Sequence, residues 1–209
     1  MPPMTTPLPW LTLSLEDLRS ALLDLFCAEA YQEGDFTLSS GQKSTYYINS
    51  KPVTLHPQGA IGVGRLLWSL VPPGTQAVAG LTLGADPLVM AVSLMAALDG
   101  QAITPLIVRK EAKGHGTRAY IEGPTLPEGS SIVVLEDVVT TGRSALQAVE
   151  RLQGAGYQVT EILALVDRQQ GGEQCYQEAK LGFQSLFQLP ELQARWRELQ
   201  AGVAVSERT

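Results

Sequence analysis

Two adjacent carboxylates, Glu136 and Asp137, follow four apolar residues in the stretch 132–144, which reads I-V-V-L-E-D-V-V-T-T-G-R-S. Two valines and a small hydroxyl- and glycine-rich turn come next and lead into a helix-like pattern. A helix N-terminus favours a phosphate because its N–H groups are unpaired and its dipole is positive there. Carboxylates accept hydrogen bonds from sugar hydroxyls. The stretch therefore predicts a site for a phosphorylated sugar at the end of a buried strand; the alternative is that these polar residues only cap a helix.

A second stretch, residues 108–123, gathers positive charge in a chain whose formal net charge is −6. Its basic residues are Arg109, Lys110, Lys113 and Arg118, with His115 between Gly114 and Gly116. Glycines make a segment adaptable, and a long loop inside a compact domain is usually functional. The stretch predicts a lid that closes over a polyanion and excludes water, with His115 as a candidate for proton transfer or anion contact. The alternative is a solvated surface loop.

Three further segments carry candidate binding residues. Residues 36–49 predict a hairpin in which Tyr46 and Tyr47 either stack on a flat ring or pack the strand. Arg168 follows an apolar run, where its guanidinium either binds a carboxylate with two hydrogen bonds or forms an ordinary surface salt bridge. Residues 80–87, G-L-T-L-G-A-D-P, place backbone N–H groups after a strand, where they can form an anion-binding nest.

The elements that must position these residues alternate between strands and helices. Strands are expected at 77–81, 103–108, 132–135 and 159–166, and helices at 87–98 and 143–153. This repetition predicts an α/β fold with a central, mostly parallel sheet flanked by helices, in which ligands bind beyond the C-terminal strand ends. Before this core, Ser14 and Asp17 predict a capping box that opens a helix ending at Gly34, and another helix is expected at about 60–70.

The composition limits the class of protein. A chain of 209 residues fits one domain, or one domain with a small subdomain, and its acidic balance argues against nucleic-acid binding. The two cysteines, Cys27 and Cys175, show no disulfide or metal pattern, so a cytoplasmic location is expected, with Cys27 in the core. The N-terminus does not resemble a signal peptide, and no run of ~20 apolar residues could cross a bilayer. No membrane partner is therefore expected.

Four ordered blocks between residues 34 and 170 resemble the orotate phosphoribosyltransferases, a group of type I phosphoribosyltransferases. E-D-V-V-T-T-G-R-S is similar to their motif for phosphoribosyl pyrophosphate (PRPP), and R-K-E-A-K-G-H-G to their flexible catalytic loop, R-K-x-x-K-x-H-G. F-T-L-S-S-G-Q-K-S-T-Y-Y is similar to their N-terminal signature, and Arg168 stands where they place an arginine for the orotate carboxylate. Some members carry lysines where this chain has Ser39 and Gly84, which leaves the ligand contacts at both positions open.

The resemblance implies transfer of the 5-phosphoribosyl group from PRPP to orotate, giving orotidine 5′-monophosphate and pyrophosphate in de novo pyrimidine (UMP) biosynthesis. It implies catalytic roles for Lys113, His115 and Asp137, and orotate contacts for Thr140, Arg168, Tyr46 and Tyr47. The implied PRPP site comprises Arg109, Lys110, Lys113, His115, Glu136, Asp137, Val138, Val139, Thr140, Thr141, Gly142, Arg143 and Ser144. The implied cofactor is Mg²⁺, held mainly by PRPP and water near the two carboxylates.

The same resemblance implies a homodimer whose active sites are shared across the interface. Residues 1–13 are punctuated by prolines and are expected to form a flexible tail. A helix and a small hood over the orotate pocket are expected at about 14–55, and a core at about 60–170 with the catalytic loop at 109–123. A C-terminal helix and tail are expected at 190–209. Two alternatives remain. A phosphoribosyltransferase for purine bases should lack the catalytic-loop and hood patterns, and a non-catalytic PRPP sensor would usually carry a nucleic-acid-binding element.

Overall fold

The computed structural model describes residues 9–37, 41, 43–113 and 119–206, which fall into two units. Residues 1–62 and 190–209 belong to the first unit, and residues 63–189 belong to the second. The division falls within α3, Pro57–Trp68, close to the helix expected at about 60–70.

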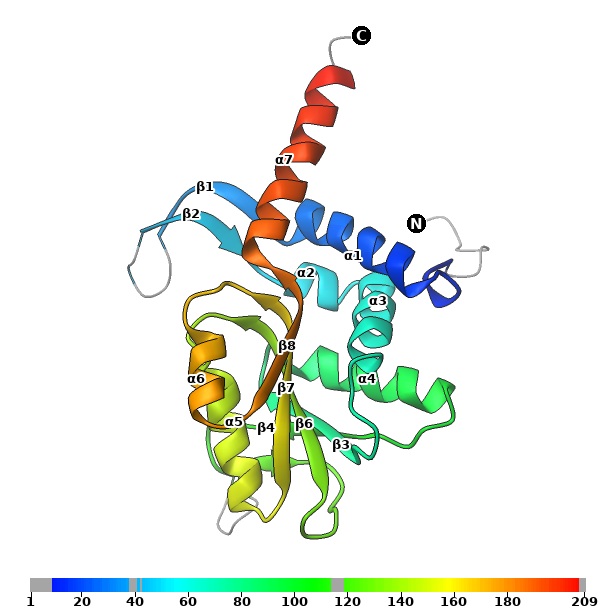
Figure 1. Ribbon diagram of the computed structural model, residues 1–209, viewed down its shortest axis with the longest axis vertical. Helices are drawn as coiled ribbons and strands as arrows, with labels where there is room; N and C mark the ends of the chain where they lie inside the picture. Colours follow the sequence, from blue (N-terminus) through cyan, green and yellow to red (C-terminus); the bar gives the residue numbers. More distant parts are fainter. Residues whose placement is uncertain (1–8, 38–40, 42, 114–118, 207–209) are drawn as a thin grey trace. The chain divides into compact units, whose positions relative to one another are not determined.

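A six-stranded sheet forms the centre of the second unit (Figure 1). Its strands are Ala77–Leu81 (β3), Thr104–Val108 (β4), Ile121–Glu122 (β5), Ser131–Val139 (β6), Gln158–Asp167 (β7) and Gly182–Gln188 (β8). The strand order is β5-β4-β3-β6-β7-β8, and each neighbouring pair is parallel except β4 with β5. The predicted α/β class with a mostly parallel sheet is therefore confirmed.

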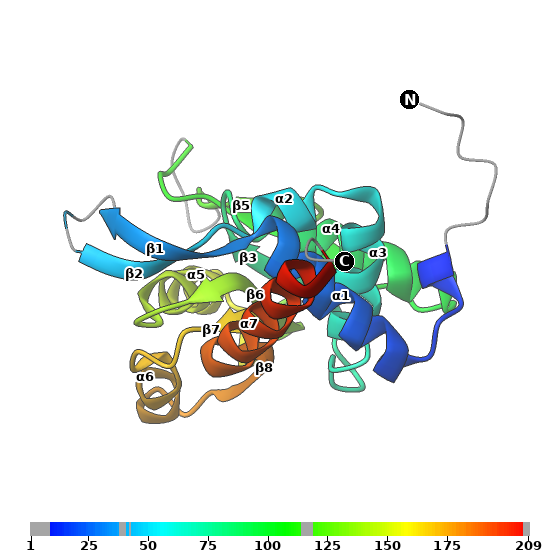
Figure 2. The same cartoon turned by 90° about the horizontal axis from the view of Figure 1, so that it is seen from above.

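Helices cover both faces of this sheet, as Figure 2 shows. The helix α4, Asp86–Leu98, packs on β3, β4 and β6, while α5, Arg143–Gly154, and α6, Gly172–Glu178, lie on the opposite face. Apolar side chains at helical spacing explain the position of α5, since Val149 and Leu152 are buried and Leu146 packs against the same core.

The carboxyl ends of β3, β4, β6 and β7 meet at one edge of the sheet because these strands run parallel. The turn after β3, the basic segment after β4, the loop after β6 and Arg168 after β7 therefore emerge at that edge. This arrangement confirms the prediction that the candidate motifs lie at C-terminal strand ends.

The structure corrects the sequence-based elements at three places in this unit. β6 continues through both carboxylates to Val139, although the sequence predicts a strand that stops at 135, because pairing with β7 extends to Val139. The polar segment 109–131 contains β5, which pairs with β4. Beyond the last predicted strand lie α6 and β8, a short helix and an edge strand whose sequences carry little periodicity.

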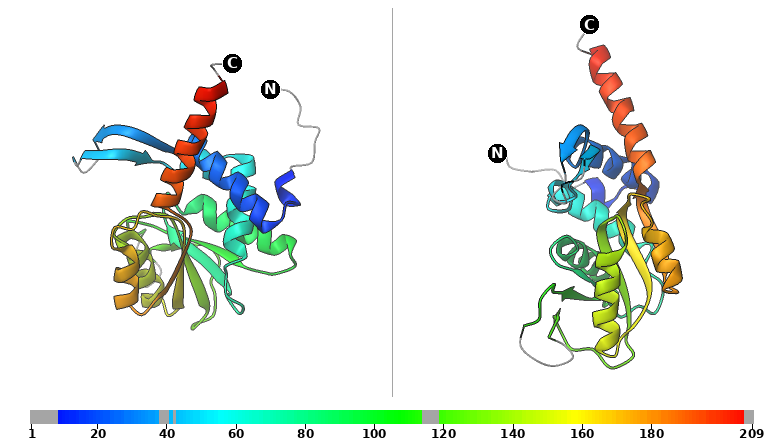
Figure 3. Two further views of the ribbon diagram at one scale, coloured as in Figure 1. Left: turned by 45° about the horizontal axis from the view of Figure 1, so that its top comes forward. Right: turned by 90° about the vertical axis from the view of Figure 1, so that its left-hand side faces the viewer.

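The first unit contains helices and one β-hairpin (Figure 3). Its elements are Pro9–Leu11 (η1), Leu15–Glu29 (α1), Tyr31–Thr37 (β1), Lys43–Ile48 (β2), Lys51–Thr54 (α2) and Leu189–Ser206 (α7), which begins one residue before the unit boundary. Ser14 caps α1 by accepting a hydrogen bond from the Asp17 backbone N–H at 3.1 Å, as predicted. The expectation that this helix ends at Gly34 is wrong, because β1 begins at Tyr31 and pairs antiparallel with β2.

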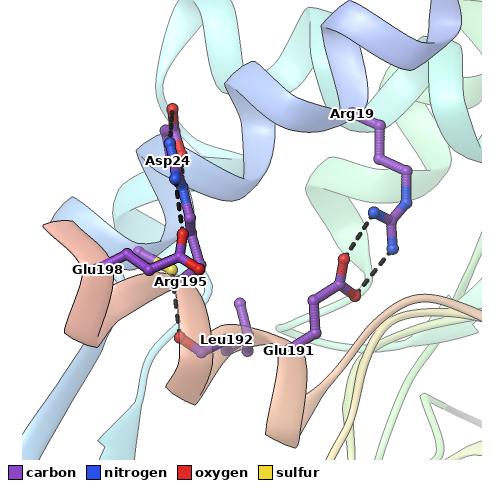
Figure 4. Close-up of polar contacts among 7 residues, drawn as sticks. Arg19, Asp24, Glu191, Leu192, Arg195 and Glu198 are labelled. Atoms are coloured by element: carbon purple, nitrogen blue, oxygen red, sulfur yellow. Dashed lines mark hydrogen bonds and ion pairs between the residues drawn. The ribbon is translucent and has the colours of Figure 1, made fainter.

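Two arginines join α1 to α7 (Figure 4). Both Nη atoms of Arg19 bind the Glu191 carboxylate at 2.6 Å and 2.8 Å. Arg195 binds Asp24 in the same paired manner, at 2.6 Å and 3.1 Å. These contacts connect segments from opposite ends of the chain, which explains why the C-terminal helix shares a unit with the N-terminal region.

Both cysteines are free thiols. Cys27 is buried, as predicted, and its Sγ donates to the Leu192 carbonyl oxygen at 3.5 Å. Burial raises the pKa of this thiol to about 12, so it stays protonated and unreactive at neutral pH. In the part of the chain that the structure describes, no helix is both long and apolar enough to cross a membrane.

Candidate active site

The stretch that follows Glu136 lines one pocket beyond the carboxyl end of β6. Its walls are residues 138–145 together with Glu136 and Tyr176. The structure therefore brings the predicted residues from 138 to 144 together around a single hollow, with Glu136 beside them.

The N-terminus of α5 borders this pocket. Its N-cap is Gly142, at φ +81°, a left-handed conformation that glycine adopts readily. A Cβ at this position would lie 2.8 Å from the Tyr176 ring, so the loop passes close over that ring. Because no described side chain caps the helix, the interpretation of Thr140 and Thr141 as mere capping residues is wrong. The first N–H groups of α5 can bind an anion instead.

Glu136 is almost fully buried, with 8% of its surface exposed. Burial, with a smaller contribution from the neighbouring Asp137, raises the pKa of its carboxyl group to about 8, and Lys110 opposes the shift. Its Oε2 has no hydrogen-bond partner among the described residues. A ligand hydroxyl in the pocket would supply the missing partner.

The stability of the protein should fall as the pH rises from about 4.5 to about 8. Over this range the folded state keeps a proton on Glu136 that the unfolded state releases, so the free energy of unfolding decreases with pH. Glu136→Gln, which stays neutral, should flatten this dependence and raise the free energy of unfolding at pH 8. Urea unfolding at several pH values measures both effects, with the exposed Glu150→Gln in α5 as the control. Parallel stability curves for Glu136→Gln and the wild type would contradict the prediction.

The carboxylate of Asp137 lies against Gly84, in the turn after β3. A Cβ built on Gly84 would lie 2.5 Å from Asp137 Cγ and 2.6 Å from Oδ2, closer than real Cβ atoms approach. In this chain, a side chain at position 84 would therefore require the Asp137 carboxylate to move. Asp137 also lies close enough to Glu136 to raise the pKa of that carboxyl group, so the two acids act on one region of the site.

Arg168 and Thr140, both predicted to contact orotate, are neighbours at the carboxyl edge of the sheet. Arg168 Nη1 donates to Thr140 Oγ1 at 3.2 Å. Its backbone N–H donates to the Val139 carbonyl oxygen at 2.9 Å, which ties Arg168 to the end of β6.

The other two predicted orotate contacts, Tyr46 and Tyr47, lie on β2 in the first unit. Tyr46 is buried and stacks on Tyr31 with ring centroids 6.2 Å apart, as the strand-packing alternative expects. Tyr47 is 44% exposed, and its ring lies 5.7 Å from that of Phe36. A role for either tyrosine in orotate binding stays a prediction, with Tyr47 the more accessible ring.

The described ends of the basic segment are joined by backbone and ionic contacts. The Arg109 N–H donates to the Tyr120 carbonyl oxygen, and the Lys113 N–H to that of Ala119, both at 2.8 Å. Glu122 Oε1 lies 3.1 Å from Arg109 Nη1 and 3.7 Å from Lys113 Nζ. His115, the remaining predicted contact of this segment, lies outside the described residues.

Arg151 is a residue of this site that the sequence patterns do not indicate. From the last turn of α5, its guanidinium donates to the carbonyl oxygens of Arg109 and Lys110, the latter at 2.8 Å. It also lies over the Tyr120 ring, 4.1 Å from the ring centroid. One side chain therefore holds both ends of the basic segment. A basic residue near a helix C-terminus is common, so no local signal distinguishes Arg151.

Arg151→Ala should lower kcat about tenfold or more, because Arg109, Lys110 and Lys113 would lose their fixed starting geometry. Arg151→Lys should recover little activity, since an ammonium cannot bind two carbonyl groups in the planar manner of a guanidinium. Steady-state kinetics measures the effect, and Arg195→Ala, an arginine with paired contacts in the first unit, is the control. Wild-type kcat in Arg151→Ala would show that this contact does not position the segment.

Comparison with known proteins identifies the family. Residues 53–193 match the family described as Phosphoribosyl transferase domain. An orotate phosphoribosyltransferase of Nostoc sp. is 63% identical over 188 residues, which cover 90% of this chain and 91% of that protein.

Solved structures agree with these relatives. Mycobacterium tuberculosis orotate phosphoribosyltransferase in complex with Fe(III) dicitrate is 36% identical, with a TM-score of 0.75 over 84% of this chain and 98% of that one. A structure of the enzyme from the same organism in complex with PRPP has 32% identity and a TM-score of 0.71 over the same shares of both chains. The pocket, the fold and these similarities lead to one conclusion: the chain belongs to the orotate phosphoribosyltransferase family of phosphoribosyltransferases.

Proposed function

We propose that this enzyme transfers the phosphoribosyl group of PRPP to orotate, releasing pyrophosphate. The observation that carries the proposal is the pocket formed by Glu136 and residues 138–145 at the N-terminus of α5. Residues 140–144 would hold the 5′-phosphate, because uncapped N–H groups at a helix N-terminus favour an anion. Arg168, beside Thr140, would bind the orotate carboxylate.

The reaction joins a ring nitrogen of orotate to the anomeric carbon of the ribose while the bond to pyrophosphate breaks. The transition state needs placement, stabilisation of the leaving charge and exclusion of water more than covalent help. Arg109, Lys110 and Lys113 would stabilise the negative charge on the departing pyrophosphate, and His115 belongs to the same proposed group. Glu136 and Asp137 would accept hydrogen bonds from the ribose hydroxyls.

Mg²⁺ is the proposed cofactor, and the available carboxylates fit it. Among the described residues, no group of three or more His, Cys, Asp or Glu side chains could hold a metal by itself. Mg²⁺ commonly binds one or two carboxylates together with substrate phosphates and water. Asp137, and Glu136 once it has lost its proton, would supply these carboxylates. The bound ion would neutralise charge on the PRPP oxygens.

A homodimer in the cytoplasm is the proposed state of the protein. Met90, Leu94 and Leu98 recur at helical spacing on α4 and are between 56% and 66% exposed, which supports burial against a second copy. Sedimentation of the purified protein measures this state. The two free cysteines support a reducing compartment.

The decisive experiment follows orotate absorbance while PRPP and Mg²⁺ are added in turn. We expect orotate to be consumed only when both PRPP and Mg²⁺ are present, and we expect pyrophosphate to form. Parallel reactions with adenine and hypoxanthine test the purine-base alternative. Folded protein that consumes a purine base but no orotate would overturn the assignment of the substrate.

A further inference from the structure

Tyr176, from α6, lines the pocket although it belongs to none of the predicted motifs. Its side chain is fully buried. The Tyr176 ring lies 5.0 Å from the Phe183 ring, and its atom Cζ, which carries the hydroxyl, would lie 3.1 Å from a Cβ on Gly142. The hydroxyl end of the ring is therefore placed beneath the loop that leads into α5.

The Tyr176 hydroxyl has no hydrogen-bond partner among the described residues. A buried hydroxyl without a partner destabilises a protein, whereas phenylalanine would fill the same space without that cost. Packing therefore accounts for the ring but not for the oxygen. Glu136, whose Oε2 also lacks a partner among the described residues, lines the same pocket. Two residues of one pocket therefore carry buried polar atoms without partners. Such groups in a folded protein call for an explanation, and a bound ligand is one.

The Tyr176 hydroxyl is suited to donate a hydrogen bond rather than to lose its proton. Burial raises the pKa of Tyr176 well above its usual range, and Glu136, Cys175 and Asp167 raise it further. The phenol therefore keeps its proton throughout the neutral range. A protonated hydroxyl beside uncapped helix N–H groups adds one more donor to a site that already favours an anion.

We propose that the Tyr176 hydroxyl donates a hydrogen bond to the 5′-phosphate of the bound substrate. The inference rests on the proposed function and adds to it a phosphate-binding residue from α6. Tyr176 would also connect α6 to the occupied pocket, since its ring already supports Gly142 from below.

Calorimetric titrations of wild type and Tyr176→Phe with ribose 5-phosphate, PRPP and pyrophosphate test this inference. We expect the Kd for ribose 5-phosphate and for PRPP to rise about tenfold, because a hydrogen bond to a charged group contributes roughly this factor. The Kd for pyrophosphate, which lacks the 5′-phosphate, should not change. The melting temperature should not fall, because the variant keeps the ring and removes only an unpartnered hydroxyl.

Tyr157→Phe is the matched control, because Tyr157 is buried in the same unit and its hydroxyl accepts a hydrogen bond from the Leu126 N–H at 3.4 Å. This control should bind ribose 5-phosphate as the wild type does. Equal affinity of wild type and Tyr176→Phe for ribose 5-phosphate, or equal weakening for all three ligands, would overturn the role of Tyr176 and leave the proposed function standing. Wild-type protein that is folded and binds neither ribose 5-phosphate nor PRPP would overturn the proposed function, and this inference with it.

Discussion

Gly84→Ala is expected to lower kcat/KM for PRPP about a hundredfold. The added methyl group would occupy the space of the Asp137 carboxylate, since a Cβ at this position lies 2.5 Å from Asp137 Cγ. The carboxylate would have to turn away, and a displacement of about 1 Å at a reacting centre commonly has an effect of this size. Initial rates at varied PRPP concentrations measure the change.

A double-mutant cycle separates this mechanism from general damage to the turn. In an Asp137→Ala background the colliding carboxylate is absent, so adding Gly84→Ala should have little further effect on kcat/KM. Gly154→Ala is the matched control, because a Cβ on Gly154 meets nothing within 4 Å. If Gly84→Ala were equally harmful with and without the Asp137 carboxylate, the proposed contact would not be the cause.

Lys113→Ala is expected to lower kcat by about two to three orders of magnitude, while orotate binding changes little. The reason is that Lys113 would act on the charge that develops as pyrophosphate leaves, and groups of this kind contribute about this much. The Lys113 side chain is 73% exposed, so its loss should not affect folding. Steady-state kinetics with a separate orotate titration measures the two quantities.

Glu122→Gln is the control for this prediction. Glu122 Oε1 lies 3.7 Å from Lys113 Nζ, so Lys113→Ala also removes an exposed ion pair. Glu122→Gln removes this pair together with the ion pair to Arg109, and it keeps both basic residues. It should leave kcat within about twofold of the wild type. A loss of activity in Glu122→Gln as large as in Lys113→Ala would assign the effect to the ion pair. Unchanged kcat in Lys113→Ala would remove the lysine from the mechanism.

The sequence by itself determined most of the residues around the pocket, though not Tyr176, and the class of fold. The apolar runs before Glu136 and Arg168 predict buried strands, and parallel strands bring such ends to one edge of a sheet. The glycine at position 142 marks the helix start, where φ is +81°. These features could be predicted because each depends on neighbouring residues and on strand and helix periodicity.

The tertiary structure alone decided how distant residues complete the site. The Asp137 carboxylate against Gly84, Arg151 on the carbonyl groups after β4, and Tyr176 beneath Gly142 all join separate elements. Local patterns show which face of a helix is apolar, but not which polar side chain meets which loop. The same limit hid β8 and the pairing of α1 with α7, because an edge strand and contacts between the two ends of the chain depend on partners distant in the sequence. Contacts of this kind arise only when packing fixes the relative positions of the elements.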